Sequence, residues 1–240
     1  MPENFKLISS IEVGNRASWE NKLFLTFDVD WAHEEVITDT LDLLHKYDVQ
    51  ATFFGTHQSP ILNSVFEDNK HEVGIHPNFN DIINNTCVGE NAESRIKNLL
   101  ELFPSAKSIR SHSTTWSGVI QELILKYEIT HECNTFIPWQ SSIDLKPWNL
   151  WNGLVRVPYF WEDDVALLFK EPKNSLRELS SKTLKVFDFH PIHIFLNSES
   201  IERYESTRQL HKNPKELLKY RYRGYGTRNK LIDLLEKFSL

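Results

Sequence analysis

Five histidines follow short apolar runs that are typical of strands. In chain order they are His57, His76, His112, His190 and His193. In parallel α/β folds the loops after the strands converge at one edge of the sheet, where ligands bind. A single histidine is more often structural than functional. Five that converge on one edge indicate a site for a metal ion or for proton transfer.

Two aspartates, Asp28 and Asp30, stand at the end of the first apolar run, residues 22–28. Residues two apart on a strand point to the same side. Two carboxylates held this close repel each other unless a cation separates them or one takes a proton. The spacing predicts that one carboxylate binds a metal ion and the other acts as a base. The alternative is that Asp30 caps the helix that follows.

Two further strand ends carry candidate ligands. His76 follows a predicted strand, and imidazole and aspartate are common ligands of zinc and similar ions. Arg110 and His112 share one face of another strand, so a fixed cation and an imidazole point the same way. The guanidinium is placed to hold the Asp28 carboxylate in its ionised form. A salt bridge that closes the mouth of a barrel is an equally compatible role for Arg110.

The last two strand ends supply a candidate acid and candidate substrate contacts. His190 leaves a buried strand and is a natural general acid beside a metal site. Helix capping or packing is the alternative for His190 and for His193. Trp161 and Asp163 follow another strand end, and because aromatic faces stack on sugars while carboxylates accept hydroxyl hydrogen bonds, we predict substrate contacts there. We assign His193 to the same group.

Alternating strands and helices must position these residues. The expected strands are 22–28, 49–55, 72–75, 108–111, 129–134, 154–157 and 184–189. The expected helices are 34–47, 92–103, 118–127 and 228–238. A strand, a helix and a strand within about 35 residues indicate a parallel pair. The polar stretch 170–183 is too short for a domain boundary, so we predict one α/β domain over residues 1–240 with barrel-like closure.

Composition limits the class of protein. The chain has 240 residues with 40% hydrophobic content, which argues against disorder. Lys and Arg number 27 against 33 Asp and Glu, a net charge of −6 that disfavours nucleic-acid binding. Two cysteines, Cys87 and Cys133, cannot build a disulfide framework. There is no secretory signal and no apolar run of about 20 residues, so we expect no membrane span and a cytoplasmic protein.

The segment 220–228 (YRYRGYGTR) interleaves arginines, aromatics and glycines. In an acidic protein this is thin support for RNA binding. A loop that contacts a phosphate through Arg221, Arg223 and Arg228 fits this segment better than RNA binding does. A simple solvated loop is the alternative.

In this order of motifs the chain resembles the NodB-homology polysaccharide deacetylases, carbohydrate esterase family four. Residues 25–30 (LTFDVD) resemble the first motif, Thr-Phe-Asp-Asp-Gly, and 51–54 (ATFF) resemble the second strand. Residues 71–76 (HEVGIH) resemble the metal motif, Arg110 stands at the arginine of the third motif, and 189–191 (FHP) resemble the last. The resemblance covers roughly residues 22–197.

The resemblance implies a deformed (β/α) barrel and a metal-dependent amide hydrolase that acts on N-acylated amino sugars. It assigns Asp28 as the base, Asp30 and His76 as metal ligands, Arg110 as the residue that orients the base, and His190 as the acid.

Three departures from the family pattern affect the site. The adjacent Asp-Asp pair is spaced here as Asp28-x-Asp30, and the second metal histidine is replaced by Asn80, whose amide oxygen is a poor zinc ligand. His112 replaces a proline and can supply the missing imidazole. We therefore expect one divalent ion, zinc, bound by Asp30, His76 and His112, with Asn80 or another histidine as the alternative third ligand.

The resemblance is greatest to a branch associated with surface-polysaccharide biosynthesis. The expected substrate is an N-acetyl or N-formyl amino sugar, nucleotide- or lipid-linked, since such precursors occur in the cytoplasm. Two alternatives are kept: a hydrolase of a small cyclic amide or ureide on the same fold, and a carbohydrate-binding protein without metal.

Overall fold

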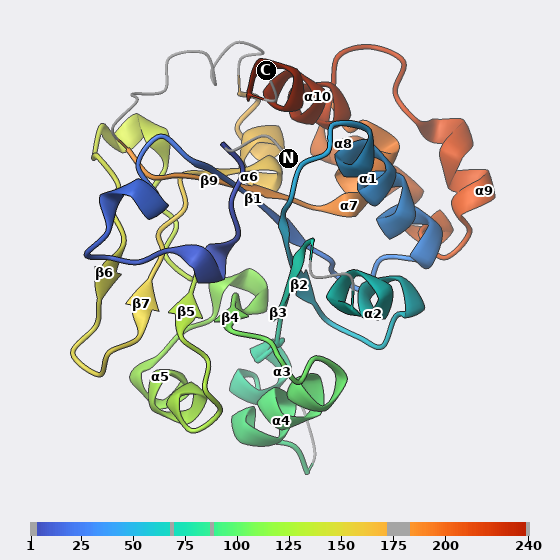
Figure 1. Ribbon diagram of the computed structural model, residues 1–240. Coiled ribbons are helices and arrows are strands. Elements are labelled where there is room, and N and C mark those ends of the chain that lie inside the picture. The colour runs from blue at the N-terminus through green and yellow to red at the C-terminus, as the bar shows by residue number, and fades with distance from the viewer. Residues whose placement is uncertain (1–3, 68–69, 87–88, 172–182, 239–240) are drawn as a thin grey trace.

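A single curled β-sheet forms the centre of the molecule in the computed structural model, which describes residues 4–67, 70–86, 89–171 and 183–238 (Figure 1). Across the sheet the described strands run in the order β6-β7-β5-β4-β3-β2-β1-β9-β8. Every neighbouring pair is parallel except β6 with β7. The strands are β1 (Leu23–Asp28), β2 (Thr52–Gly55), β3 (Glu72–Ile75), β4 (Ser108–Ile109), β5 (His131–Glu132), β6 (Trp148–Asn149), β7 (Val155–Arg156), β8 (Trp161–Glu162) and β9 (Lys185–Phe189).

Helices follow one another around the outside of the curled sheet (Figure 1). They are α1 (Glu34–Lys46), α2 (Pro60–Glu67), α3 (Asn80–Ile83), α4 (Ala92–Leu102), α5 (Gly118–Leu125), α6 (Asp163–Leu168), α7 (Pro191–Leu196), α8 (Ile201–Thr207), α9 (Pro214–Leu217) and α10 (Thr227–Phe238). Each described helix is too short or too polar to cross a membrane.

The sequence explains why β1 and α1 form. All six residues of β1 are buried, as expected for a parallel strand that is covered on both faces. Helix α1 buries an apolar stripe that includes Val36, Leu41 and Leu44. The side chain of His33, not of Asp30, accepts a hydrogen bond from the amide of Glu35 at the start of α1. The capping alternative for Asp30 is therefore wrong.

The predicted deformed barrel is confirmed, in the form of a sheet that curls without closing. In the described part of the chain, the edge strands β6 and β8 do not pair with each other. An isolated parallel β-bridge between Phe136 and Tyr159 connects the segment after β5 with the segment just before β8. The carboxyl ends of the parallel strands consequently face one shared space.

All the expected strands and helices are present, although several are shorter than expected. The strands expected at 108–111 and 129–134 pair over only two residues each, and the helix expected at 34–47 ends at Lys46. The sequence analysis missed β6, β8 and the short helices α2, α3, α6, α7, α8 and α9, most of which are too short for a clear period. Cys133 is a buried free thiol. Cys87 and most of the polar stretch 170–183 lie outside the described residues.

Candidate metal and catalytic site

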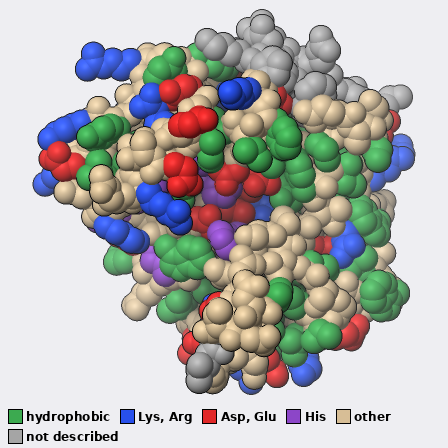
Figure 2. All heavy atoms as spheres, turned by 180° about the vertical axis from the view of Figure 1, so that it is seen from behind, with side chains coloured by type: hydrophobic (Ala, Val, Ile, Leu, Met, Phe, Trp, Pro, Cys, Tyr) green, Lys and Arg blue, Asp and Glu red, His purple; other side chains and the backbone are tan. Residues whose placement is uncertain are grey.

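The side chains predicted from four strand ends meet in one hollow. Asp28 ends β1, His76 follows β3, Arg110 follows β4, and His190 follows β9. Because these strands are parallel, their carboxyl ends lie at one edge. Figure 2 shows acidic and histidine side chains gathered inside a depression on that face of the molecule. His57 belongs to none of the groups of candidate ligands among the described residues, and its Nδ1 lies 2.8 Å from Thr56 Oγ1.

Asp30, His76 and His112 form a cluster that can hold a metal ion. One ligand atom from each lies within 4.8 Å of the others. Asp30 Oδ1 is 2.9 Å from His112 Nδ1 and 3.2 Å from His76 Nε2. Both ring nitrogens of His76 are buried and make no hydrogen bond of good geometry with the described residues. A buried imidazole without such a bond fits a metal ligand, because buried polar atoms are normally paired.

The charge of Asp30 is set by the two histidines. Burial alone would raise the pKa of Asp30, but hydrogen bonding to His112 and the nearby His76 outweigh burial and hold that pKa well below its ordinary value. The hydrogen bond to Asp30 in turn raises the pKa of His112. A proton would therefore compete with a metal ion for His112.

The loop after β1 aims Asp30 into the site through an unusual backbone. Asp30 and Trp31 both have left-handed conformations, with φ of 45° and 56°. Such conformations are costly for residues with a side chain and persist where the surroundings hold them. The Trp31 amide donates to Thr56 Oγ1 at 3.0 Å, and Lys212 Nζ donates to the Trp31 carbonyl at 2.8 Å. The sequence analysis missed Trp31, whose half-exposed ring packs edge-on against His112.

Asn80 is turned toward other partners. Its amide nitrogen donates to Ser113 Oγ at 3.1 Å, and its amide oxygen accepts from Thr115 Oγ1 at 2.9 Å. The geometry therefore favours His112 over Asn80 as the third ligand.

Arg110 is completely buried and holds Asp28 in place. Its Nη1 donates to Asp28 Oδ1 at 2.9 Å and to Thr26 Oγ1 at 2.8 Å, and it also contacts Asp188. The guanidinium is sandwiched between the rings of Phe54 and Tyr159, with centroid distances of 4.7 and 4.5 Å.

The electrostatics of this group depend on two carboxylates that share one guanidinium. Burial would lower the pKa of Arg110, but Asp188 and Asp28 outweigh burial and raise it well above its ordinary value. Burial and the neighbouring Asp28 raise the pKa of Asp188, although Arg110 opposes them. The sequence analysis missed Asp188. Its signal is a lone carboxylate between the two phenylalanines of a buried strand.

His190 is fixed from behind by Asp163. Its Nδ1 lies 2.7 Å from Asp163 Oδ1, and its backbone amide donates to Asp163 Oδ2 at 2.8 Å. The other ring nitrogen, Nε2, faces the site and lies 3.7 Å from Asp30 Oδ2. Asp163 is fully buried, so the predicted substrate contact is wrong for this residue. It orients His190 instead.

His193 is also withdrawn from the substrate space. Its Nε2 lies 2.5 Å from Asp164 Oδ1 and its Nδ1 lies 3.0 Å from Ser198 Oγ. With both nitrogens paired and the side chain buried, the predicted substrate contact through His193 is wrong. Asp164, which the sequence analysis missed, also lies 4.0 Å from His190 Nε2.

The neighbouring carboxylates control the charge of His190. Burial would lower the pKa of His190, but Asp164 and Asp163 outweigh burial and raise that pKa well above its ordinary value. This shift favours the protonated form of His190, in which an imidazole can donate a proton.

The arginines at 221 and 228 serve the fold. Arg221 Nη2 lies 3.1 Å from Asp39 of α1, and Arg228 pairs with the same carboxylate. Arg221 Nε also donates to the carbonyl of Phe195. These contacts fasten the segment before α10, and α10 itself, to α1. The expectation of a phosphate site at Arg221 and Arg228 is therefore wrong.

Comparisons with known proteins show what the chain is similar to. The sequence profile of the WbmS-like polysaccharide deacetylase family matches residues 25–208. The crystal structure of WbmS from Bordetella bronchiseptica, described as a polysaccharide deacetylase involved in O-antigen biosynthesis, has a TM-score of 0.94 and 39% sequence identity, with 98% of each chain covered. A family 4 carbohydrate esterase from Streptomyces lividans in complex with acetate has a TM-score of 0.48 and 14% identity, covering 91% of this chain and 89% of that one. No curated protein matches the chain.

The family profile spans most of the chain, and the likeness to the Bordetella protein extends over nearly the whole length of both. The chain belongs to the WbmS-like polysaccharide deacetylase family.

Proposed function

We propose that this protein is a metal-dependent hydrolase that removes an N-acyl group from an amino sugar in a surface-polysaccharide precursor. One observation carries the proposal: Asp28 and His190 converge on the cluster of Asp30, His76 and His112. A carboxylate and a protonated imidazole beside a metal cluster are the groups that amide hydrolysis needs. The O-antigen role of the similar Bordetella protein supports the choice of substrate.

A divalent ion bound by Asp30, His76 and His112, with zinc as our expectation, would polarise the acyl carbonyl and lower the pKa of a bound water toward about 7. The nitrogen and oxygen donors of this set are those that zinc accepts.

Asp28 supplies the base through one oxygen. Its Oδ1 is paired with Arg110, while Oδ2 lies 3.7 Å from His76 Nε2 and therefore faces the metal cluster. We infer that Oδ2 takes the proton of the attacking water. Arg110 keeps the carboxylate aimed and favours its ionised form.

His190 supplies the acid through Nε2. Asp163 holds Nδ1, so the proton that His190 can donate points into the hollow. We infer that Nε2 protonates the amide nitrogen as its bond to the acyl carbon breaks, which gives a free amine and a carboxylate.

The direct test is hydrolysis by zinc-loaded protein. We expect release of free amine from at least one sugar in a panel of N-acetyl and N-formyl amino sugars, free and nucleotide-linked, measured with an amine-reactive dye. Metal-stripped protein is the control. Release from cyclic amides or ureides alone, or binding of sugars without release, would contradict the proposal.

We expect His112→Ala to weaken zinc binding by at least about 100-fold, because disturbing even the residues that support a ligand costs about 10–100-fold. Isothermal titration with zinc measures the change. His57→Ala removes a nearby histidine outside the cluster and should leave zinc affinity unchanged. Equal affinity in both variants would remove His112 from the ligand set.

A pH profile tests the state of His190. Because its pKa is raised, kcat/KM should be level near neutral pH and fall as rising pH removes the proton from His190. The acidic groups near this ring are Asp28, Asp30, Asp163, Asp164, Asp188 and Glu162. Asp163→Asn removes one of these charges, so the alkaline fall should move to lower pH. Asp144→Asn, which changes an exposed carboxylate, is the control. If the alkaline limb of the kcat/KM profile of Asp163→Asn stays at the same pH, His190 is not the titrating acid.

A further inference from the structure

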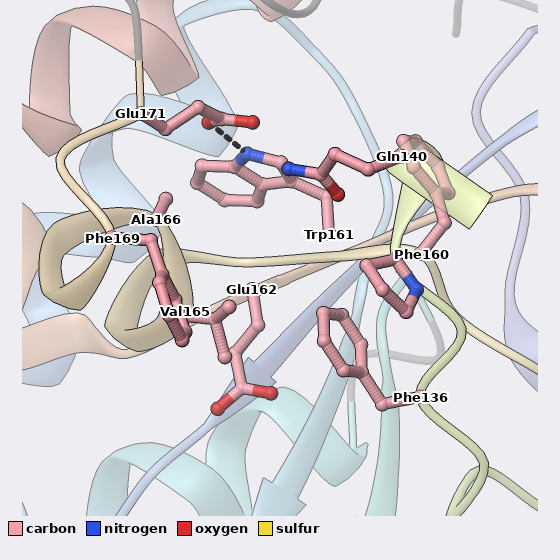
Figure 3. A pocket seen from close by; sticks show the side chains of 10 residues that line it. Phe136, Gln140, Phe160, Trp161, Glu162, Val165, Ala166, Phe169 and Glu171 are labelled. Atoms are coloured by element: carbon pink, nitrogen blue, oxygen red, sulfur yellow. Dashed lines mark hydrogen bonds between the residues drawn. The ribbon is translucent and has the colours of Figure 1, made fainter. Parts of the chain in front are cut away.

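An apolar groove lies between β8, α6 and the segment after β5. It encloses about 290 Å³. Figure 3 shows Trp161 along one side, Phe136 and Phe160 along a second, and side chains of α6 and its carboxyl end opposite them. The latter are Val165, Ala166 and Phe169. Phe169 is 74% exposed at the rim. Phe160 and Trp161 are almost fully buried, so the apolar surface that is open to water comes from Phe169 and the partly buried Phe136.

Glu162 stands between the groove and the catalytic hollow. This residue lines the groove, and its carboxylate oxygen also lies within 4.8 Å of ligand atoms of Asp164 and His190. Tyr159 donates a hydrogen bond to Glu162 Oε2 at 3.0 Å, which fixes the side chain between the two spaces. We infer that a molecule bound at His190 extends past Glu162 into the groove.

The direction of extension follows from the role of His190. In the proposed reaction His190 Nε2 protonates the leaving nitrogen, so that nitrogen lies beside His190 when the bond breaks. Glu162 and the groove lie on this side of the site, away from the cluster of Asp30, His76 and His112 that receives the carbonyl. The part of the substrate attached to nitrogen, and not the acyl group, is thus the part that reaches the groove.

The lining offers both kinds of contact that a sugar ring makes. Aromatic faces pack against the C–H faces of a pyranose, and polar groups at the ends accept or donate hydrogen bonds to its hydroxyls. Glu162 provides a carboxylate, and Gln140 provides an amide elsewhere in the lining (Figure 3).

This inference rests on the proposed function. We propose that the groove lined by Phe136, Phe160 and Phe169 binds a pyranose ring on the amine side of the scissile bond, and that Glu162 accepts a hydrogen bond from one hydroxyl of this ring. The groove then selects the sugar, while the acyl group lies at the metal cluster.

Methyl NMR of the zinc-loaded full chain tests the proposal. Val165 and Ala166 carry methyl groups that line the groove and act as reporters. The probes are N-acetylglucosamine, N-acetylgalactosamine, their free amines and diacetylchitobiose. We expect at least one probe to shift both reporters in a saturable way, and decylamine, an aliphatic amine, to shift neither.

Phe136→Ala and Phe169→Ala should each weaken binding of that probe about 3- to 10-fold, the range of a single aromatic contact. Because Phe169 is exposed, its variant is not expected to unfold the protein. For a probe that is hydrolysed, KM should rise with kcat unchanged, since the ring contact is the same in the ground and transition states. Trp151→Ala, an exposed aromatic in the turn between β6 and β7, is the matched control and should change nothing.

Three results would overturn the groove proposal: no probe shifts the reporters, only decylamine shifts them, or a sugar is hydrolysed while the reporters stay still. The last result would leave the proposed function intact. Saturable reporter shifts without any amine release would support the groove and contradict the proposed function, so the two can fail separately.

Discussion

Replacing Asp28 with asparagine should lower kcat about 10²–10⁴-fold while the divalent ion stays bound. An amide has nearly the shape of a carboxylate, so its oxygen can still accept the hydrogen bond from Arg110. It cannot take a proton from water at the position of Oδ2. The measurements are kcat at saturating substrate and zinc content by elemental analysis of the same sample.

The retained metal is the essential control for Asp28→Asn. If zinc is lost together with activity, Asp28 is a ligand and not the base. If most activity remains, Asp28 serves only as a structural partner of Arg110. Either result would require another residue for proton removal.

Replacing Arg110 with methionine should destabilise the fold by about 3–5 kcal/mol, the cost of breaking a buried ion pair from one side. Two buried carboxylates, Asp28 and Asp188, would lose their shared cation. Urea unfolding measures the loss. Arg208→Met provides the contrast, because Arg208 is an exposed partner of Glu205 and such pairs contribute about 0–1 kcal/mol.

A double variant separates charge from packing at this position. Adding Asp188→Asn to Arg110→Met removes one of the two uncompensated carboxylates, so part of the lost stability should return. Recovery shows that the cost arises from unpaired charge. No recovery would mean that Arg110 stabilises the fold mainly by packing between Phe54 and Tyr159.

The sequence is enough to place the site residues that directly follow a long apolar strand. Asp28 and His190 are of this kind, because buried parallel strands show as near-continuous apolar runs and their carboxyl ends share one edge. The clustering of Asp30 with His76 and His112 could be expected for the same reason. Its geometry could not, since it depends on two left-handed residues at 30 and 31.

The residues around His190 show where local patterns stop being informative. Asp163 follows an aromatic segment and resembles a sugar contact. In the fold, β8 pairs with β9 so that Glu162 lies opposite Asp188, and this register carries Asp163 behind His190. The register between strands some 25 residues apart in the chain is a tertiary property. The prediction of a phosphate site at Arg221 and Arg228 was wrong for a similar reason, because their partner Asp39 lies far away in sequence.

The position of β9 beside β1 has a consequence for synthesis of the chain. The metal cluster draws on residues up to His112, whereas His190 follows a strand made 78 residues later. At about 5–20 residues per second, this is a delay of roughly 4–16 s on the ribosome. During that interval β1 can pair with β2 but has an open edge where β9 belongs, and its side chains are those of a fully buried strand. An open apolar edge is a template for aggregation. The recovery of soluble protein should therefore depend on how well that edge is shielded until translation passes residue 189. A lower growth temperature and a larger supply of chaperones are the conditions to vary first.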